Sequence, residues 1–180
     1  MPKICKTARY NRFQKSKIQK NTYDEFSFSK SLKSYKDEEL FFTNFVKTKN
    51  NECYQKIERY LDQCSLGDYN FLEDEFLPLD EIYYTEPSGK RLLAIINKGY
   101  HHHFKPDDLK NIFEIKHKMK KGFHFFLYVK GNKIEVLMID FFHLGIEAYL
   151  WINGKPKKMH KEDIYHKECN NDWDLNNLVK

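Results

Sequence analysis

Long apolar segments and paired cysteines are both absent from this sequence. No run of 18 or more apolar residues occurs, which argues against a membrane-spanning helix, and no apolar segment follows the basic N-terminus as a secretory signal would require. The four cysteines are widely separated and form no CxxC pair, a pattern that favours reduced thiols over a disulfide framework. We therefore expect a soluble, cytoplasmic protein without a membrane partner.

Several motifs of common enzyme classes are also missing. The chain has no phosphate-binding glycine-rich loop, no GxSxG nucleophile elbow and no HExxH zinc motif. Arginine occurs only four times, yet lysine is common enough to give a net charge of +5. The residues in excess, including Lys, Asn, Ile, Tyr and Phe, are those of AT-rich codons, so the charge alone does not identify a partner.

The N-terminal segment has a composition of its own. Residues 1–20 contain seven basic residues and no acidic one. Arg9 and Arg12 could neutralise phosphates, and Tyr10 and Phe13 could stack on unpaired bases. We interpret residues 1–36 as a flexible basic arm that contacts nucleic acid, with a solvated tail as the alternative.

Local patterns predict several elements before the central part of the chain. Acidic residues 37–39 predict the start of a helix, and apolar spacing predicts a second helix over 52–63. Residues 86–89 predict a turn and 91–97 a buried strand. Pro106, the acidic pair that follows it, the basic residues near 120 and Gly122 together predict a helix over 106–121.

The second half of the chain predicts a β-sheet. Strands are expected over 123–129 and 133–142, joined by a tight turn at Gly131-Asn132, and a further hairpin is expected over 148–159. The predicted fold class is therefore α+β, with N-terminal helices packed on a mainly antiparallel sheet formed by residues 91–159. Residues 37–167 would form this single domain, and 168–180 a polar, peripheral tail.

Two groups of residues suggest metal chemistry only weakly. His101 and His103 would share one face of a strand, but no carboxylate or cysteine has ligand spacing to them, so we expect the three consecutive histidines to pack beside Tyr100 and Phe104. The segment Glu114-Ile115-Lys116 resembles half of a nuclease ExK motif, but it falls within the predicted helix. We therefore predict neither a metal site nor a cofactor.

A set of candidate catalytic residues lies on the predicted ribbon. His124 and Tyr128 share one face of its first strand, and His143 follows the end of the second. These side chains could transfer protons near neutral pH, and Lys120 and Lys121 could stabilise phosphate charge, which together suffice for metal-independent RNA cleavage. The alternative is that they are half-buried structural residues. Asp140, on an apolar strand, would pair with His143 or a lysine.

The segment from Asp107 to His143 resembles a known family. Its text, KGFHFFLYV followed by KIEVLMI, resembles the terminal sheet of RelE/ParE-type toxins of bacterial toxin–antitoxin systems. His124 stands where that family carries a strand arginine. The resemblance implies a helix preceding antiparallel strands, cleavage of mRNA, and an antitoxin-like protein partner.

Two classes of function follow. The first is a small RNA-directed toxin or ribonuclease, which predicts growth arrest on expression and its relief by His143→Ala. The second is a non-enzymatic accessory or regulatory protein of a mobile element that binds nucleic acid or protein through the arm. It predicts that deletion of residues 1–20 abolishes activity while the histidine variant stays active.

Overall fold

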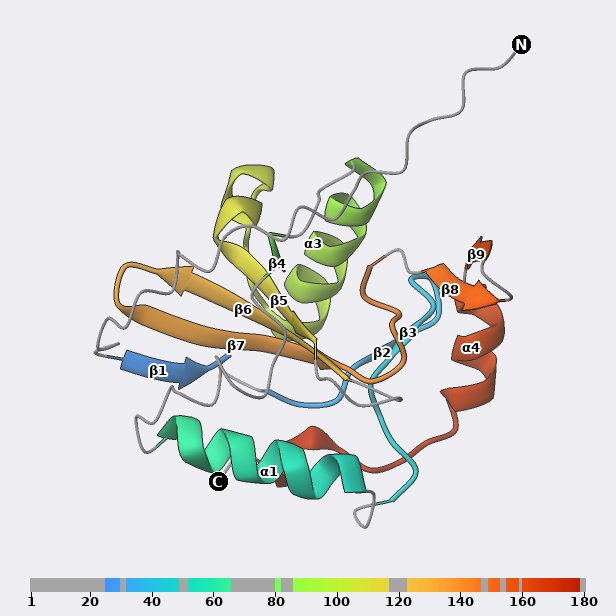
Figure 1. The fold of residues 1–180 in the computed structure, drawn as a ribbon, viewed down its shortest axis with the longest axis horizontal. Coiled ribbons are helices and arrows are strands. Elements are labelled where there is room, and N and C mark those ends of the chain that lie inside the picture. The colour runs from blue at the N-terminus through green and yellow to red at the C-terminus, as the bar shows by residue number, and fades with distance from the viewer. Residues whose placement is uncertain are drawn as a thin grey trace.

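The fold is organised around a central β-hairpin. Strands β6 (His124–Lys130) and β7 (Lys133–Asp140) are antiparallel, and Gly131 turns the chain between them with a φ of 58°. This hairpin, predicted from the sequence, is confirmed. The computed structural model (Figure 1) describes residues 25–29, 32–48, 52–65, 80–81, 86–116, 123–146, 149–152, 155–158 and 160–178.

Three more strands complete a mixed five-stranded sheet in the order β1-β7-β6-β5-β4. Strand β5 (Ile112–Lys116) pairs antiparallel with β6, and the short β4 (Asp80–Glu81) pairs antiparallel with β5. On the other side, β1 (Glu25–Phe28) runs parallel to β7. The sheet is thus mainly antiparallel, with one parallel edge.

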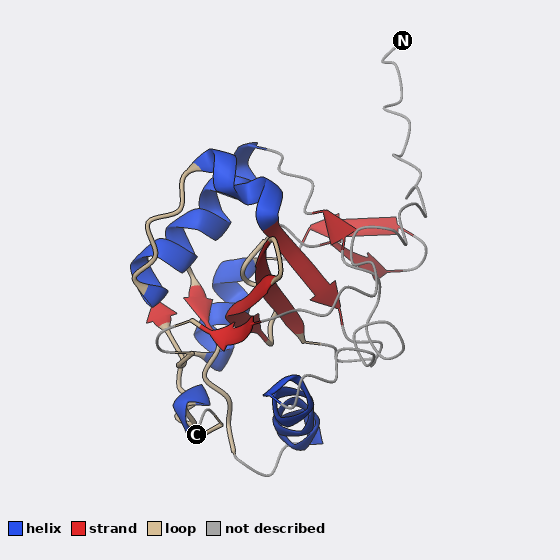
Figure 2. Ribbon diagram, turned by 90° about the vertical axis from the view of Figure 1, so that its left-hand side faces the viewer, coloured by secondary structure: helices blue, strands red, loops and turns tan. Residues whose placement is uncertain are grey.

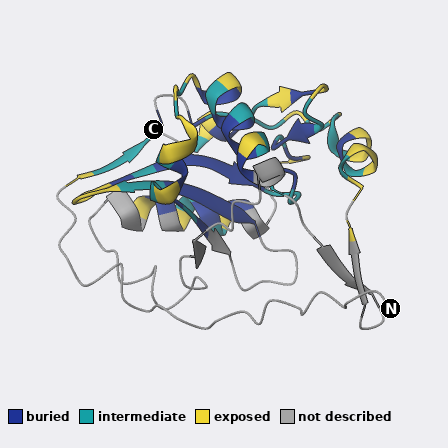
Figure 3. Ribbon diagram, turned by 90° about the horizontal axis from the view of Figure 1, so that it is seen from above, coloured by how far each residue is buried: buried dark blue, intermediate teal, exposed yellow. Residues whose placement is uncertain are grey.

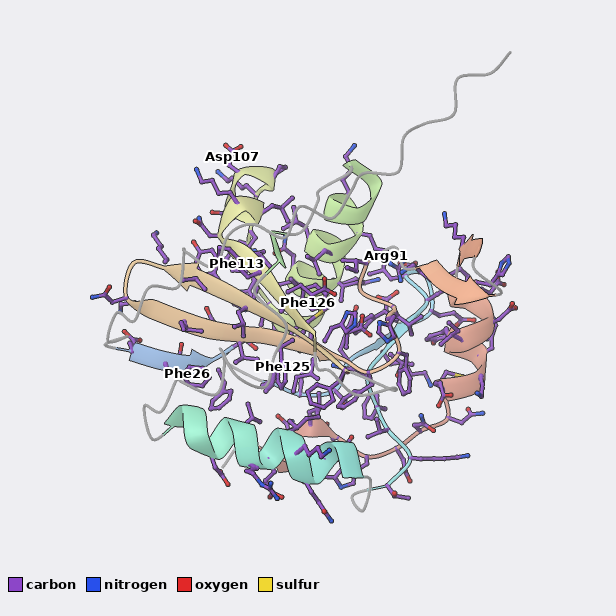
Figure 4. All side chains as sticks on the ribbon, in the orientation of Figure 1. Phe26, Arg91, Asp107, Phe113, Phe125 and Phe126 are labelled. Atoms are coloured by element: carbon purple, nitrogen blue, oxygen red, sulfur yellow. The ribbon has the colours of Figure 1, made fainter. Side chains whose placement is uncertain are left out.

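Two helices cover the two faces of this sheet. Helix α1 (Glu52–Ser65) places Tyr54, Ile57 and Leu61 against one face, and helix α3 (Glu86–Tyr100) packs against the other. Because adjacent strand residues point to opposite faces, Phe125 lies in the α1 core and Phe126 in the α3 core (Figure 4). The strands between the helices are the most buried part of the molecule (Figure 3). The α+β class predicted from the sequence is confirmed.

A β-bulge interrupts the regular alternation of β7. Phe126 pairs with Met138 whereas Leu127 pairs with Val136, so Leu137 is an extra residue opposite β6. Leu137 and Met138 consequently both belong to the α3 core, and residues beyond them change face. The Oγ of Ser29, just after β1, donates to the Leu137 carbonyl over 3.1 Å, which satisfies a backbone group at the bulge.

Smaller elements surround the sheet (Figure 2). They are the β2–β3 pair (Lys36–Asp37 and Phe42–Thr43), the 3-10 helix η1 (Pro106–Asn111), the β8–β9 ribbon (Tyr149–Ile152 and Lys155–Lys158), helix α4 (Lys161–Glu168) and the 3-10 helix η2 (Leu175–Asn177). The hairpin predicted over 148–159 is confirmed, but it forms a two-stranded sheet of its own rather than extending the main one.

Helix α3 contacts the β2–β3 segment through one polar cluster. The buried Asp37 carboxylate accepts hydrogen bonds from the Tyr35 hydroxyl at 2.6 Å and the Leu40 amide at 3.0 Å, and Lys98 Nζ lies 2.6 Å from the same carboxylate. Burial alone would raise the pKa of Asp37, but the hydrogen bonds from Lys98, Tyr35 and Leu40 outweigh it and lower that pKa. The cluster therefore holds Asp37 as an anion.

Four local predictions are wrong, and the first is the turn predicted over 86–89, which instead begins helix α3. Residues 37–39 end a strand and enter a turn rather than start a helix, and the side chains of Asp37 and Glu39 bind Lys98 of helix α3. Residues 91–97 are helical, and Pro87 lies in the first turn of α3, where its missing N–H is tolerated. The predicted helix over 106–121 is the 3-10 helix η1 only as far as Asn111, and residues 112–116 form β5 because they pair with β6. Its last part, 117–121, lies outside the described residues.

The two chain segments expected at the periphery also contribute to the fold. Within the presumed arm, residues 25–28 form β1, and Leu32 is buried in the α1 core. Within the presumed tail, Trp173 bridges to Val46 and packs on Tyr54 with ring centroids 4.0 Å apart. Leu175 of the same segment is fully buried.

Candidate functional site

The structure brings two of the three predicted catalytic side chains together. His124 begins β6 and His143 lies in the loop after β7, yet their rings contact edge to face, with centroids 4.0 Å apart and planes at 90°. His124 is buried, with 8% of its surface exposed, whereas His143 is only partly buried. Of the two imidazoles, His143 is therefore the one that a dissolved substrate could reach.

A third residue, Glu114, contacts His124 from the neighbouring strand. It lies on β5, whose residues 114 and 116 pair with 126 and 124 of β6, so Glu114 is diagonal to His124 on the same sheet face. Its Oε1 lies against His124 Nδ1, and only 2% of the residue is exposed. A buried carboxylate in contact with Nδ1 restrains the orientation of the imidazole ring.

The loop that carries His143 is held by a buried carboxylate. Asp140 is fully buried, and its two oxygens accept backbone N–H groups from Phe142 at 3.2 Å, Leu144 at 3.0 Å and Gly145 at 2.6 Å. We expected Asp140 to pair with His143 or a lysine, but the structure assigns it backbone amides instead. These bonds close the chain around Asp140 and fix where His143 projects.

Two cations hold the carbonyl groups of the same loop. Arg91 of α3 donates from Nε and Nη2 to the Leu144 carbonyl, at 2.9 and 2.7 Å (Figure 4). Lys161, at the start of α4, donates to the carbonyls of His143 at 3.5 Å, Leu144 at 3.3 Å and Ile146. The amides thus bind an anion and the carbonyls bind cations, so the loop is restrained from both sides.

The backbone of this loop is tightly constrained at two positions. His143 has a φ of 59°, in the left-handed region that non-glycine residues adopt only uncommonly and that Phe41 and His101 also adopt. At Gly145, a Cβ atom would lie 2.7 Å from Met138 Cε and 2.9 Å from an Asp140 oxygen, so glycine is required there. A histidine in an unfavourable conformation, held by surrounding contacts, is a common feature of functional sites.

Tyr128, the third predicted catalytic residue, lies apart from the two histidines. It is on the same face of β6 as His124 but four positions further along, about 13 Å away at about 3.3 Å per residue. Its ring instead packs on Phe104, with centroids 4.9 Å apart. Arg9, Tyr10, Arg12, Phe13, Lys120 and Lys121, the predicted nucleic-acid contacts, lie outside the described residues.

Of the three consecutive histidines, only His102 packs beside Phe104 as expected, whereas His101 and His103 are exposed. The His102 ring stacks on Phe104 with centroids 4.7 Å apart and planes within 10°. Burial lowers the pKa of His102, and the neighbouring His103 and His101 lower it further. Burial raises the pKa of Glu135, whose Oε1 lies 3.7 Å from His102 Nε2. This group lies beside Tyr128 and away from the His124–His143 pair.

Sequence reasoning missed Glu114, Arg91 and Lys161. Glu114 was assigned to a helix, although the alternation of Ile112 and Glu114 with Phe113 and Ile115 is also that of a strand beside β6. For Arg91 and Lys161 no sequence signal exists, because both bind backbone carbonyls remote in the chain. The sequence does contain a signal for the role of Asp140, because an aspartate shortly before a glycine often accepts hydrogen bonds from nearby backbone amides.

Neither similarity to known proteins nor a metal-ligand cluster adds to this picture. Comparison with family models, with curated proteins and with solved structures finds no significant match to this chain. Within the described part of the chain, no group of three His, Cys, Asp or Glu side chains is arranged to hold a metal ion. The helices described there include none long and apolar enough to cross a bilayer.

Proposed function

We propose that this protein is an RNA-directed ribonuclease that acts by proton transfer at His143. The proposal is carried by one observation, the buried contact between the Glu114 carboxylate and His124, whose ring contacts the partly exposed His143. A side chain that transfers protons must be reachable and correctly oriented, and it works best when its partners are already in place. In this arrangement His143 is the catalytic residue, and Glu114 and His124 are positioning residues.

The reaction follows from the chemistry of RNA. The His143 imidazole accepts the proton of a ribose 2′-hydroxyl, and the 2′ oxygen attacks the adjacent phosphorus. The bond from phosphorus to the 5′ oxygen breaks, and the imidazolium returns the proton to that oxygen. The products are a 2′,3′-cyclic phosphate and a 5′-hydroxyl end, and neither water nor a redox partner is consumed. DNA, which lacks the 2′-hydroxyl, is not cut.

The restraint of the 140–146 loop supports this role. Three side chains from three elements bind the backbone of the loop: Asp140 of β7, Arg91 of α3 and Lys161 of α4. Such fixing matters because a displacement of about 1 Å at a reacting group can cost about 100-fold in rate. By the same reasoning an antitoxin-like protein would inhibit the enzyme by covering His143, and the cytoplasm would be its place of action.

His143→Asn is the decisive variant. Asparagine tolerates the left-handed conformation at position 143 but cannot transfer a proton in this way. We expect the purified full chain to cut a labelled RNA pool in the presence of EDTA, with or without added ribosomes, and to leave 2′,3′-cyclic ends. The substitution should lower the rate at least about 100-fold, the usual contribution of general acid–base catalysis.

His101→Asn is the matched control. His101 also has a positive φ, 57°, but it is exposed and lies outside the site, so its replacement should leave the rate unchanged. Glu114→Gln should lower kcat more than it changes KM, because it disturbs orientation rather than RNA binding. Failure of the native chain to cut RNA under both conditions, or full activity of His143→Asn, would refute the proposal.

A further inference from the structure

Three carbonyl groups of the 140–146 loop converge on one point, and the Lys161 ammonium occupies that point. Its Nζ lies 3.5 Å from the His143 oxygen and 3.3 Å from the Leu144 oxygen, and it also contacts the Ile146 oxygen. An ammonium carries three N–H donors and no acceptor, so it can donate one hydrogen bond to each of these carbonyls. Backbone carbonyl oxygens are also the groups that replace the water shell of potassium in channel filters.

The direction of these carbonyls is linked to Asp140 through the peptide units themselves. In a planar trans peptide, the C=O of one residue and the N–H of the next point in opposite directions. The Leu144 and Gly145 N–H groups are bound by Asp140, at 3.0 and 2.6 Å. The carbonyls of the same two peptide units, those of His143 and Leu144, therefore point away from Asp140 and toward Lys161. Each unit is thus held by an anion at one end and a cation at the other.

Helix α4 supplies this positive charge from an anchored position. Lys161 is the first residue of α4, and Tyr165, one turn later, is buried. The Tyr165 ring packs on Phe41 in the turn between β2 and β3, with centroids 6.0 Å apart, and α4 lies beside β3 (Figure 1). Because these contacts hold the helix, the ammonium is placed independently of the loop that it binds.

We propose that the carbonyls of His143, Leu144 and Ile146 form a site for a small monovalent cation, and that Lys161 fills this site from within the chain. With the ammonium in place, the two peptide units that follow His143 keep the orientation that fixes where its imidazole projects. In the proposed ribonuclease, on which this part of the inference rests, Lys161 is a positioning residue. It acts through the backbone of His143 and touches neither the RNA nor the reacting atoms.

Lys161→Ala tests the cation site without any substrate. The substitution removes the ammonium and its stem and opens the site to cations from solution. Urea unfolding is measured while tetramethylammonium, which is larger and has no N–H, is replaced stepwise by ammonium at constant total chloride. Ammonium should stabilise the variant in a saturable way, and a site half-filled at about 10 mM would raise the ratio of folded to unfolded chain about tenfold at about 100 mM. The native chain, whose site is already filled, measures the general effect of the two salts.

Three further variants separate the geometry of the site from its charge. Lys161→Arg keeps the charge, but a planar guanidinium spreads its donors in a fork and cannot direct three of them from one atom. It should therefore remain less stable than the native chain in either salt. Lys161→Met retains an apolar stem across the site and should not respond to ammonium. Lys167→Ala removes a lysine of the same helix whose side chain is 78% exposed, and it should behave as the native chain does.

Cleavage of labelled RNA tests the positioning role. Lys161→Ala should lower kcat by about 100-fold, the loss expected when a reacting group is displaced by about 1 Å. The KM should stay within about twofold of the native value, because Lys161 does not touch the RNA. Ammonium should restore kcat at least about tenfold in Lys161→Ala but not in Lys161→Met, which carries the same loss of charge.

The outcomes separate this inference from the proposed function. A Lys161→Ala chain that responds to ammonium no more than the native chain, or that stays unfolded at every ammonium concentration, would overturn the cation site. Native stability in Lys161→Arg would overturn the assigned geometry. Because unfolding needs no substrate, these results decide the site even if the native chain cuts no RNA, which would refute only the ribonuclease. Native kcat in Lys161→Ala without ammonium, beside an inactive His143→Asn, would overturn the positioning role alone.

Discussion

The Asp140 carboxylate offers the most direct test of how the site is built. In Asp140→Ala, three backbone amides lose their acceptor, and two of these bonds are buried, at 3.0 and 2.6 Å. A hydrogen bond to a charged group contributes about 1.5–3 kcal/mol. Taking the low end for the two buried bonds, and less for the 3.2 Å bond to Phe142, we expect a loss of about 4 kcal/mol in the free energy of unfolding.

Asp140→Asn should cost less, because its amide oxygen can still accept from Phe142 and Leu144. The remaining amide group would then face the Gly145 N–H, and a single lost bond of this kind costs about 2 kcal/mol. Exposed Asp172 supplies the matched control, and Asp172→Ala should change stability by less than about 0.5 kcal/mol.

Equilibrium unfolding in urea, followed by tryptophan fluorescence, measures these differences. Trp173 is a suitable probe because it packs on Tyr54, at the α1 face of the sheet. The slope of free energy against urea should stay the same if only the native state is affected. A loss below about 1 kcal/mol in Asp140→Ala, or equal losses in the two Asp140 variants, would refute the role of this carboxylate as the acceptor that closes the loop.

Two further predictions concern the contact between α3 and the β2–β3 segment. Gly99→Ala should destabilise the protein by about 1 kcal/mol or more although alanine favours helices, because its Cβ would lie 2.5 Å from the Tyr35 ring. Adding Tyr35→Leu to this variant should relieve the loss. Unfolding midpoints that show no such relief would contradict this explanation. Folding lowers the pKa of Asp37 below its unfolded value of about 3.9. Its carboxylate therefore stabilises the protein fully at pH values above about 3.9, and this stabilisation is lost as the pH falls through the lower folded pKa. Asp37→Asn should therefore lose stability at pH 6 but approach the native chain near pH 2 in acid-unfolding experiments, whereas an equal deficit at both pH values would rule out this linkage.

The sequence predicted the fold well where local signals and tertiary contacts agree. The β6–β7 hairpin combines alternating apolar residues with a Gly-Asn turn, and α1 has clear helical spacing; both were correctly predicted. The prediction from sequence fails where local signals and tertiary contacts conflict. Residues 112–116 follow good helix-start signals, yet pairing with β6 buries Ile112 and Glu114 between neighbouring elements, and this gain exceeds the local preference.

The short apolar run of α3 illustrates a different difficulty. Leu92, Leu93, Ile95 and Ile96 are all buried, so the run has no polar face within that stretch to distinguish helix from strand. Only the longer spacing to Gly99 and Tyr100, together with Pro87 in the first turn, favours the helix.

The candidate site was predicted only in part for a related reason. The predicted hairpin placed His124 and His143 near each other, because His124 begins β6 and His143 follows the end of the antiparallel strand β7. Glu114, Arg91 and Lys161 come from elements whose type or position the local sequence does not determine. Tyr128 was grouped with the histidines because it shares their face, but four strand positions separate it from His124.

The extra residue at Leu137 changes which face of the sheet the later side chains of β7 point to. Up to Val136, β7 contributes alternate side chains to the layer beneath α1, and from Met138 onward the phase is inverted. Without that inversion Asp140 would be directed into the apolar layer beside α1, with no amides to bind. Deleting one residue from this strand would therefore reverse the polarity of its whole distal end, while a compensating insertion before Asp140 would restore it. Chain length at this point, more than the identity of residue 137, decides whether the strand can end in a polar centre.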